Sequence, residues 1–238
     1  MRPEPQSSSA KFDVSRAAEY GIQSRVALAG YDACHELTAC ILAASLSSGR
    51  AARILVVGVG GTAQEIINMS ALEPLWTFVG VDPAPAMLET AAANLEAHGL
   101  MEKTQLVLGT VEDLVLDEPF DAATLIGVLH HVPGDEPKRQ LLRSIQARLK
   151  ADAPFVVACN HYRYAEQPLL LQTWAERWRQ QGATPDEVKA KRARIMQGAD
   201  PPSSEQAVGT LLQECGFGPL QRFFSSLFWG AWVTHKQA

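Results

Sequence analysis

The sequence lacks several features that mark particular classes of protein. None of its 238 residues lies in an apolar run approaching the roughly 18 residues of a membrane span, and the opening MRPEPQSSSA holds no signal-peptide core. With a net charge of −5, no run of Lys or Arg is long enough to attract a phosphate backbone. We therefore expect a soluble, cytoplasmic protein that is not exported and binds neither membranes nor nucleic acid.

Cysteine is also scarce. The four cysteines, Cys34, Cys40, Cys159 and Cys215, show no paired spacing, and each falls in an apolar stretch. We expect four buried free thiols, which suits a reducing compartment.

What the sequence does contain is enough apolar residue, 47% of the chain, to bury the core of one large domain. The Pro- and Ser-rich residues 1–12 are expected to form a flexible tail, and 13–238 a single domain. Helical apolar spacing between 13 and 50 predicts two N-terminal helices.

Short β-branched runs then alternate with helical stretches, which is typical of a parallel sheet wrapped by helices. Two further β-rich runs near the C-terminus predict an antiparallel hairpin that closes the sheet. The expected strands are 53–57, 76–81, 105–108, 122–126, 155–158, 219–224 and 227–234, and the expected helices between the parallel strands include 84–97 and 136–150.

Between the last parallel strand and the hairpin, the helical segments 168–181 and 185–197 follow each other with no strand between them. We interpret 165–200 as an inserted helical cap. Thr184-Pro185-Asp186-Glu187 carries a capping threonine, a first-turn proline and a reciprocal glutamate, and Ser203-Ser204-Glu205-Gln206 predicts a second helix start of the same kind.

The clearest functional signal is the turn Gly58-Val59-Gly60-Gly61 between a strand and a helix. Such a turn lets the backbone and the helix amides approach a nucleotide. Asp82 follows 22 residues after Gly60, at the end of the next strand, where a carboxylate can accept both hydroxyls of a ribose. The alternatives are a plain tight turn and an NAD site, since Gly58-x-Gly60-x-x-Ala63 satisfies the dinucleotide fingerprint. A dinucleotide needs a second mononucleotide-binding half, which the predicted hairpin does not supply.

With these motifs in order, the chain resembles a class I S-adenosylmethionine (SAM)-dependent methyltransferase over about residues 12–235. The resemblance implies a Rossmann-like, mostly parallel seven-stranded sheet, and SAM as the cofactor. It rests on 54–62, on 79–88, on 108–114 and on Phe120-Asp121-Ala122 to Leu129-His130-His131-Val132. The implied cofactor-binding residues are Tyr31, Gly58, Val59, Gly60, Gly61, Asp82, Pro83, Met87, Thr110, Val111, Ile126, Gly127 and His130.

Two outer regions resemble the carboxy-SAM synthase branch of this fold, namely Ala29-Gly30-Tyr31 and Lys191-Arg192. In that branch a tyrosine and an arginine contact the SAM-derived ligand. One position departs from the family pattern: Val56 stands two residues before the first glycine, where an acid usually helps to hold the amino group of SAM.

Candidate catalytic residues follow the ends of the fourth and fifth strands, where open α/β sheets bind ligands. We assign His130, His131, Asn160 and Tyr162 to this role, with His130 on the cofactor side and an imidazole as the proton acceptor. Tyr20, Arg192 and Trp229 are assigned to the substrate. Arg192 can also be read as one basic residue of a solvated helix, and the tryptophans 174, 178, 229 and 232 as packing or as an aromatic wall. Adjacent histidines diverge, so no metal is expected.

The leading hypothesis is methyl transfer from SAM to a small-molecule acceptor, with S-adenosylhomocysteine (SAH) as the product. The missing acid at Val56 raises a second one, in which the SAM amine attacks its own Cγ to form azetidine-2-carboxylate and release methylthioadenosine. Carboxy-SAM synthesis and a catalytically silent SAM-binding module are further alternatives. A homodimer is left open.

Overall fold

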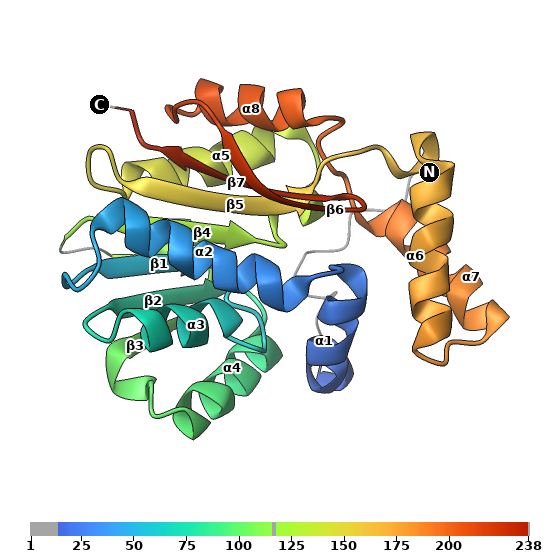
Figure 1. The fold of residues 1–238 in the computed structure, drawn as a ribbon, viewed down its shortest axis with the longest axis horizontal. Coiled ribbons are helices and arrows are strands. Elements are labelled where there is room, and N and C mark those ends of the chain that lie inside the picture. Colours follow the sequence, from blue (N-terminus) through green and yellow to red (C-terminus); the bar gives the residue numbers. More distant parts are fainter. Residues whose placement is uncertain (1–13, 116–117, 238) are drawn as a thin grey trace.

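The computed structural model describes residues 14–115 and 118–237, with side chains from residue 21 onward, and the expected tail at 1–12 lies outside this part. Its centre is a seven-stranded sheet in the order β3-β2-β1-β4-β5-β7-β6 (Figure 1). The strands are β1 (Arg53–Val57), β2 (Thr77–Asp82), β3 (Thr104–Leu108), β4 (Ala122–Ile126), β5 (Pro154–Asn160), β6 (Gln221–Ser226) and β7 (Trp229–His235).

Pairing is parallel from β3 through β5, and β7 runs antiparallel to both β5 and β6. The predicted mostly parallel sheet with a C-terminal antiparallel hairpin is therefore confirmed. The carboxyl ends of β1, β2 and β4 meet at one edge, on either side of the point where the strand order reverses. Ligands of open α/β sheets bind at such a point.

Helices cover both faces of this sheet. On one face, α5 (Asp135–Ala147) and α8 (Glu205–Glu214) pack on a cluster that includes Leu55 and Val57. On the other face, α2 (Tyr31–Leu46), α3 (Gln64–Leu72) and α4 (Pro85–Ala97) cover Ile54 and Val56 (Figure 1). Alternate residues of β1 thus face opposite layers, which explains why the strand is a continuous apolar run.

A third group of helices lies beyond the end of the sheet. Helices α6 (Pro168–Gln180) and α7 (Pro185–Gly198) form the predicted helical insertion, and they stand beside α1 (Val14–Ala27) in Figure 1. Trp174 and Trp178 of α6 share an apolar cluster with Val26. The insertion therefore packs on the end of the N-terminal helix and on Phe228, between β6 and β7.

The predicted helix starts are present. The Thr184 hydroxyl accepts from the Glu187 amide while the Glu187 carboxylate accepts from the Thr184 amide, and the Ser204 hydroxyl accepts from the Ala207 amide. One expectation is wrong: Cys40 is exposed, whereas the other three cysteines are buried. Cys40 lies on the outward face of α2, one residue past buried Ala39, and an apolar stretch does not reveal which face of a helix is turned outward.

No helix in the described part of the chain is long and apolar enough to cross a membrane.

Candidate functional site

The glycine turn between β1 and α3 brings backbone to the surface of a cavity. Gly58 and Gly60 have φ angles of +73° and +58°, in the left-handed region that glycine tolerates best. A Cβ added to Gly58 would lie 2.2 Å from Val128 Cγ2, so the two chain segments approach more closely than any side chain allows. Both glycines line the cavity. Of their neighbours in the turn, Val59 packs into the core, and the Gly61 carbonyl accepts from Asn94 of α4.

Asp82 ends β2 opposite this turn. Its Oδ2 accepts a hydrogen bond from the Gly60 amide at 3.1 Å, and its Oδ1 accepts from the Ala84 amide at 2.9 Å. Burial raises the pKa of this carboxyl, although the two amide hydrogen bonds oppose the shift. Two backbone amides thus fix the direction of the carboxylate, and each oxygen keeps lone-pair capacity for a ligand donor.

The cavity has a volume of about 540 Å³, which lies within the range of small-molecule sites. It brings together nine of the thirteen predicted cofactor-binding residues and one predicted catalytic residue. These are Gly58, Gly60, Asp82, Pro83, Met87, Thr110, Val111, Ile126 and Gly127, together with His131.

One wall of the cavity is formed by a short 3-10 turn after β3. The Thr110 hydroxyl and amide both donate to the Asp113 carboxylate, at 2.9 and 2.8 Å. These bonds hold the Thr110 side chain in a cap at the start of the 3-10 turn Val111–Asp113. Ser144 and Arg148, in α5 and at its end, donate to the Glu112 carboxylate and carbonyl, so this wall is held both by its own turn and by α5.

The two histidines after β4 have different surroundings. His131 lines the cavity, whereas His130 is 3% exposed and is not among the lining residues. The His130 Nδ1 accepts a hydrogen bond from the backbone amide of Asn160 at 3.4 Å. The His130 ring meets the Trp229 ring edge-on, with 5.0 Å between centroids. Burial lowers the pKa of His130 well below its usual value, and the charges of His131 and Lys138 lower it further. His130 is thus a neutral ring behind the cavity wall, and His131 is the ring at the cavity.

Asn160 and Tyr162 lie at and just beyond the end of β5. Asn160 is buried, and its side-chain Nδ2 donates to the Tyr164 hydroxyl at 2.7 Å, which fixes the position of its Oδ1. The Tyr162 ring packs on His161 at 4.1 Å between centroids. Neither Asn160 nor Tyr162 lines the cofactor-side cavity.

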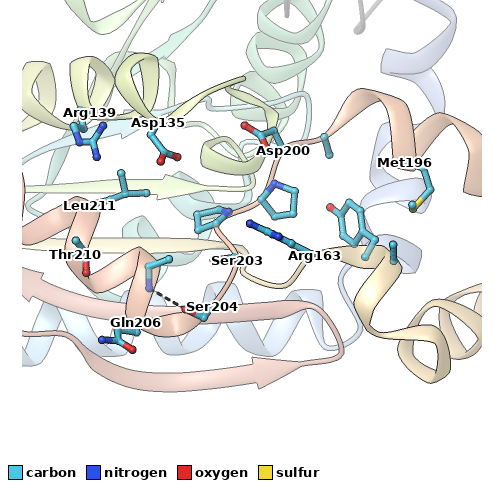
Figure 2. Close-up of a pocket in the computed structure, with 16 residues that line it drawn as sticks. Asp135, Arg139, Arg163, Met196, Asp200, Ser203, Ser204, Gln206, Thr210 and Leu211 are labelled. Carbon is cyan, nitrogen blue, oxygen red and sulfur yellow. Dashed lines mark hydrogen bonds between the residues drawn. The ribbon is translucent and has the colours of Figure 1, made fainter.

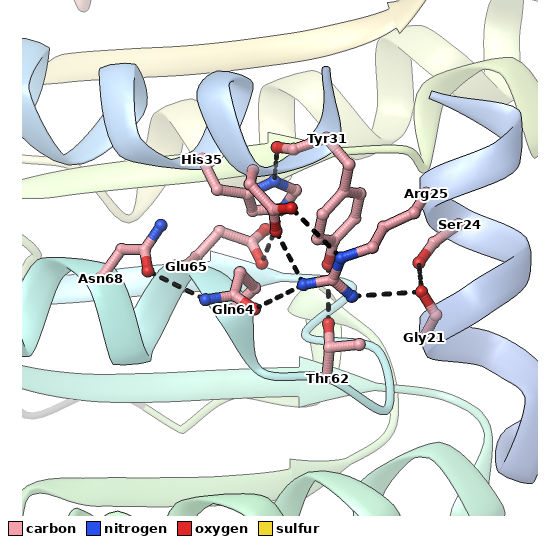
Figure 3. Close-up of polar contacts among 10 residues, drawn as sticks. Gly21, Ser24, Arg25, Tyr31, His35, Thr62, Gln64, Glu65 and Asn68 are labelled. Atoms are coloured by element: carbon pink, nitrogen blue, oxygen red, sulfur yellow. Dashed lines mark hydrogen bonds and ion pairs between the residues drawn. The ribbon is translucent and has the colours of Figure 1, made fainter. Parts of the chain in front are cut away.

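Tyr31 supports the glycine turn from the side of α2. Its hydroxyl shares a 2.7 Å hydrogen bond with the Thr62 hydroxyl (Figure 3). Tyr31 does not line the cavity. Behind it, His35 Nδ1 donates to the Tyr31 carbonyl at 2.8 Å and Nε2 faces the buried Glu65 carboxylate at 3.6 Å. Burial works to lower the pKa of His35, but the Glu65 carboxylate and the Tyr31 carbonyl outweigh it and the pKa is raised.

The predicted substrate residues are spread over the molecule. Arg192 lies on α7 and reaches Gln172 of α6 at 3.5 Å, so it is not brought to the cavity. Trp229 packs beside Gly127, and its indole N–H donates to the Ala27 carbonyl at 3.0 Å. The side chain of Tyr20 lies outside the described residues.

The position of the missing acid is occupied by a fully buried side chain. Val56 belongs to the apolar cluster beneath α2 and α3 and does not line the cavity. Its apolar character is therefore explained by packing.

The sequence analysis did not predict the part of the cavity that is lined by α5, by the last residues of β1 and β2, and by the loops after β3 and β4. Helix α5 presents Pro137, Gln140 and Leu141 to the cavity. Their only sequence signal is their place in the first turns of the helix after the histidines. The other lining residues that were not predicted are Val57, Val81, Gly109, Glu112, Val128 and Val132.

A second cavity, of about 770 Å³, lies between the start of α5, the segment after α7 and α8 (Figure 2). Its walls carry both charges, from Asp135, Asp200, Arg139 and Arg163. Among the described residues, no group of three or more His, Cys, Asp or Glu side chains is arranged to hold a metal ion.

A family model described as a methyltransferase domain matches residues 56–155, which hold the glycine turn, Asp82 and the histidine turn. The search of curated protein sequences finds no match.

Solved structures share the fold over most of this chain. A Nostoc punctiforme PCC 73102 protein provisionally assigned as an O-methyltransferase has a TM-score of 0.68 at 15% identity and covers 94% of this chain and 59% of its own. An O-methyltransferase family 2 protein from Planctomyces limnophilus DSM 3776, solved with apigenin, has a TM-score of 0.67 at 14% identity. The match covers 99% of this chain and 64% of that protein. Human N-acetylserotonin methyltransferase, solved with SAM, has a TM-score of 0.66 at 18% identity. The match covers 97% of this chain and 59% of that protein. The chain spans less than two thirds of the length of each of these proteins, and it has the Rossmann-like fold that methyltransferases share.

Proposed function

We propose that the protein binds SAM in the 540 Å³ cavity and transfers its methyl group to a small-molecule acceptor. The observation that carries this proposal is the buried Asp82 carboxylate, which two backbone amides aim at the cavity opposite the Gly58–Gly60 turn. A carboxylate at the end of the second strand is the group that accepts the hydroxyls of a ribose. The match of 56–155 to the methyltransferase domain supports the same assignment.

The residues of the cavity fit one nucleoside. The absence of a side chain at Gly58 leaves backbone at the surface, since a Cβ there would meet Val128. Met87, Val111 and Ile126 supply apolar contacts around it. A dinucleotide would need a second mononucleotide-binding half, and β7 runs antiparallel at that place in the sheet.

When bound, SAM supplies a methyl group on a positively charged sulfur, and the protein needs to align and enclose the reactants. Asp82 would hold the ribose, and the backbone of Gly58 and Gly127 would lie beside the remainder of the cofactor. His131, at the cavity, is the residue we propose to take a proton from a hydroxyl acceptor. His130 belongs to the turn that carries His131, and Asn160 and Tyr162 lie at and just beyond the end of β5. None of the three lines the cavity.

The class of acceptor is inferred from the fold. One structural neighbour was solved with apigenin, and we propose a small organic molecule as the acceptor here too. We do not propose cyclisation of SAM, because burial of Val56 in the core explains the residue that suggested it.

The test is calorimetric titration of SAM and of SAH into the protein and its Asp82→Ala variant. Loss of two hydrogen bonds to a charged acceptor, about 3 kcal/mol together, should weaken binding about 100-fold. Asp152→Asn is the matched control, because Asp152 is exposed in a turn with φ +57°, which asparagine also adopts. If the wild type and Asp82→Ala bind SAM and SAH with equal affinity, the proposal that Asp82 binds the ribose is refuted.

A second measurement addresses the reaction. The protein is incubated with SAM alone and then with a panel of phenolic and other hydroxyl acceptors, and the products are separated by chromatography. We expect SAH only when an acceptor is present. Methylthioadenosine formed from SAM alone would overturn methyl transfer.

A further inference from the structure

The segment that leaves the helical insertion is fastened to the histidine turn through Asp200. Asp200, the second residue after α7, makes two hydrogen bonds to the segment that joins β4 to α5 and one to Lys138 of α5. Its amide donates to the His130 carbonyl at 2.8 Å, and its Oδ2 accepts from the Gly134 amide at 2.7 Å and from Lys138 Nζ at 2.8 Å. Asp200 thus joins the insertion to the wall of the cavity.

These contacts bracket His131. The bond to His130 lies immediately before it, and the bond to Gly134 lies three residues after it. His131 and Val132 line the cavity and lie between these two contacts. Their backbone is therefore held on both sides. Gly134, at φ +79°, is also the residue from which α5 begins, so the same contact sets the start of that helix.

The third contact explains why an aspartate is needed. The Lys138 side chain is 1% exposed, and a buried ammonium requires a counter-charge. Asp200 provides it, and its own side chain is 55% exposed, at the wall of the second cavity (Figure 2). The carboxylate can therefore be exchanged without filling or emptying space in the core.

We propose that Asp200 is a positioning residue, which holds the His131 turn in its place at the cofactor cavity and couples that place to the position of α6 and α7. The inference rests on the proposed function only in calling this cavity the SAM site. A shift of α7 moves Asp200, and the main chain on either side of His131 moves with it.

The test measures the position of His131 directly. The protein contains six histidines, so labelling with [ε1-13C]histidine gives a small set of resonances, and His131→Gln identifies the one that matters. In Asp200→Ala we expect the His131 resonance to shift or broaden, and SAH binding to weaken about tenfold, the equivalent of one hydrogen bond. Asp186→Ala, an exposed aspartate at the start of α7, is the control and should leave both unchanged.

Asp200→Ala also leaves the buried Lys138 ammonium without its partner, and we expect a Tm lower by about 10 °C. The double variant Asp200→Ala/Lys138→Met removes that charge. A positioning role predicts that its Tm recovers while the His131 resonance and the SAH affinity stay altered. Recovery of all three together, or a wild-type His131 resonance in Asp200→Ala, would overturn the proposal. If the wild type does not bind SAH, the proposed function fails, and the His131 resonance of the ligand-free variants still decides the role of Asp200.

Discussion

Replacing Gly58 by alanine tests whether the close approach at the glycine turn is required. The φ of +73° costs an alanine about 1 kcal/mol. The new Cβ would also lie 2.2 Å from Val128 Cγ2, and relieving such an overlap by moving a packed side chain costs about 2 kcal/mol. We therefore expect Gly58→Ala to lower the free energy of unfolding by about 3 kcal/mol, and to abolish SAH binding because backbone and Val128 both move at the cavity wall.

Gly49 provides a matched control for the backbone effect. Its φ is +80°, and a Cβ added there meets no atom within 4 Å. Gly49→Ala should therefore lose about 1 kcal/mol and bind SAH normally. The difference between the two variants, measured by urea unfolding followed by circular dichroism, isolates the steric contribution at Gly58.

The double variant Gly58→Ala/Val128→Ala completes the test. Shortening Val128 removes the atom that the new Cβ would meet, so part of the lost stability should return, and the two substitutions should be non-additive by about 1–2 kcal/mol. The reasoning is refuted if Gly58→Ala costs no more than Gly49→Ala, or if shortening Val128 only adds to the loss.

Two further predictions concern the supports of the site. Glu65→Gln should cost about 3 kcal/mol at pH 6, and this cost should fall as the pH is raised through the raised pKa of His35, measured by urea unfolding over a pH series. The reason is that the raised pKa of His35 contributes stability that is present in acid and is lost as the pH rises through that pKa; a cost independent of pH would contradict this. Trp174→Phe and Trp229→Phe each remove one of two indole donors at 2.9 and 3.0 Å from the Ala27 carbonyl, and each should cost about 1 kcal/mol beyond the lost packing. The double variant leaves that carbonyl without either indole, so its cost should exceed the sum by about 1 kcal/mol in thermal or urea unfolding, and strict additivity would argue against a shared acceptor.

The fold followed from local pattern because buried parallel strands are short continuous apolar runs. β1 and β4 begin and end at the predicted residues, and the other parallel strands differ by one or two. The hairpin was predicted from its composition, but its strands begin later, at Gln221 and Trp229. Leu227 has φ +51° and belongs to the turn, which its apolar side chain does not reveal.

The cavity was predictable where backbone geometry decides it. Glycines with positive φ and an acid at a strand end carry their own signal, as Gly58, Gly60 and Asp82 show. Which of two adjacent histidines faces a cavity depends on a single 3-10 turn, Leu129–His131, whose rotation comes from tertiary contacts. Arg192 and Asp200 belong to contacts between elements, so neither could be placed from sequence spacing alone.

The end of helix α1 has a consequence for the order in which the chain folds. Its last carbonyls are taken by side chains far along the sequence: Arg177 donates to Arg25 and Val26, and Trp174 and Trp229 donate to Ala27. The partners lie 147 to 202 residues away. During synthesis the carbonyls at the end of α1 are therefore made at least 147 residues before any of these donors. The end of α1 can therefore complete its hydrogen bonds only after the insertion and the β6–β7 hairpin have been made.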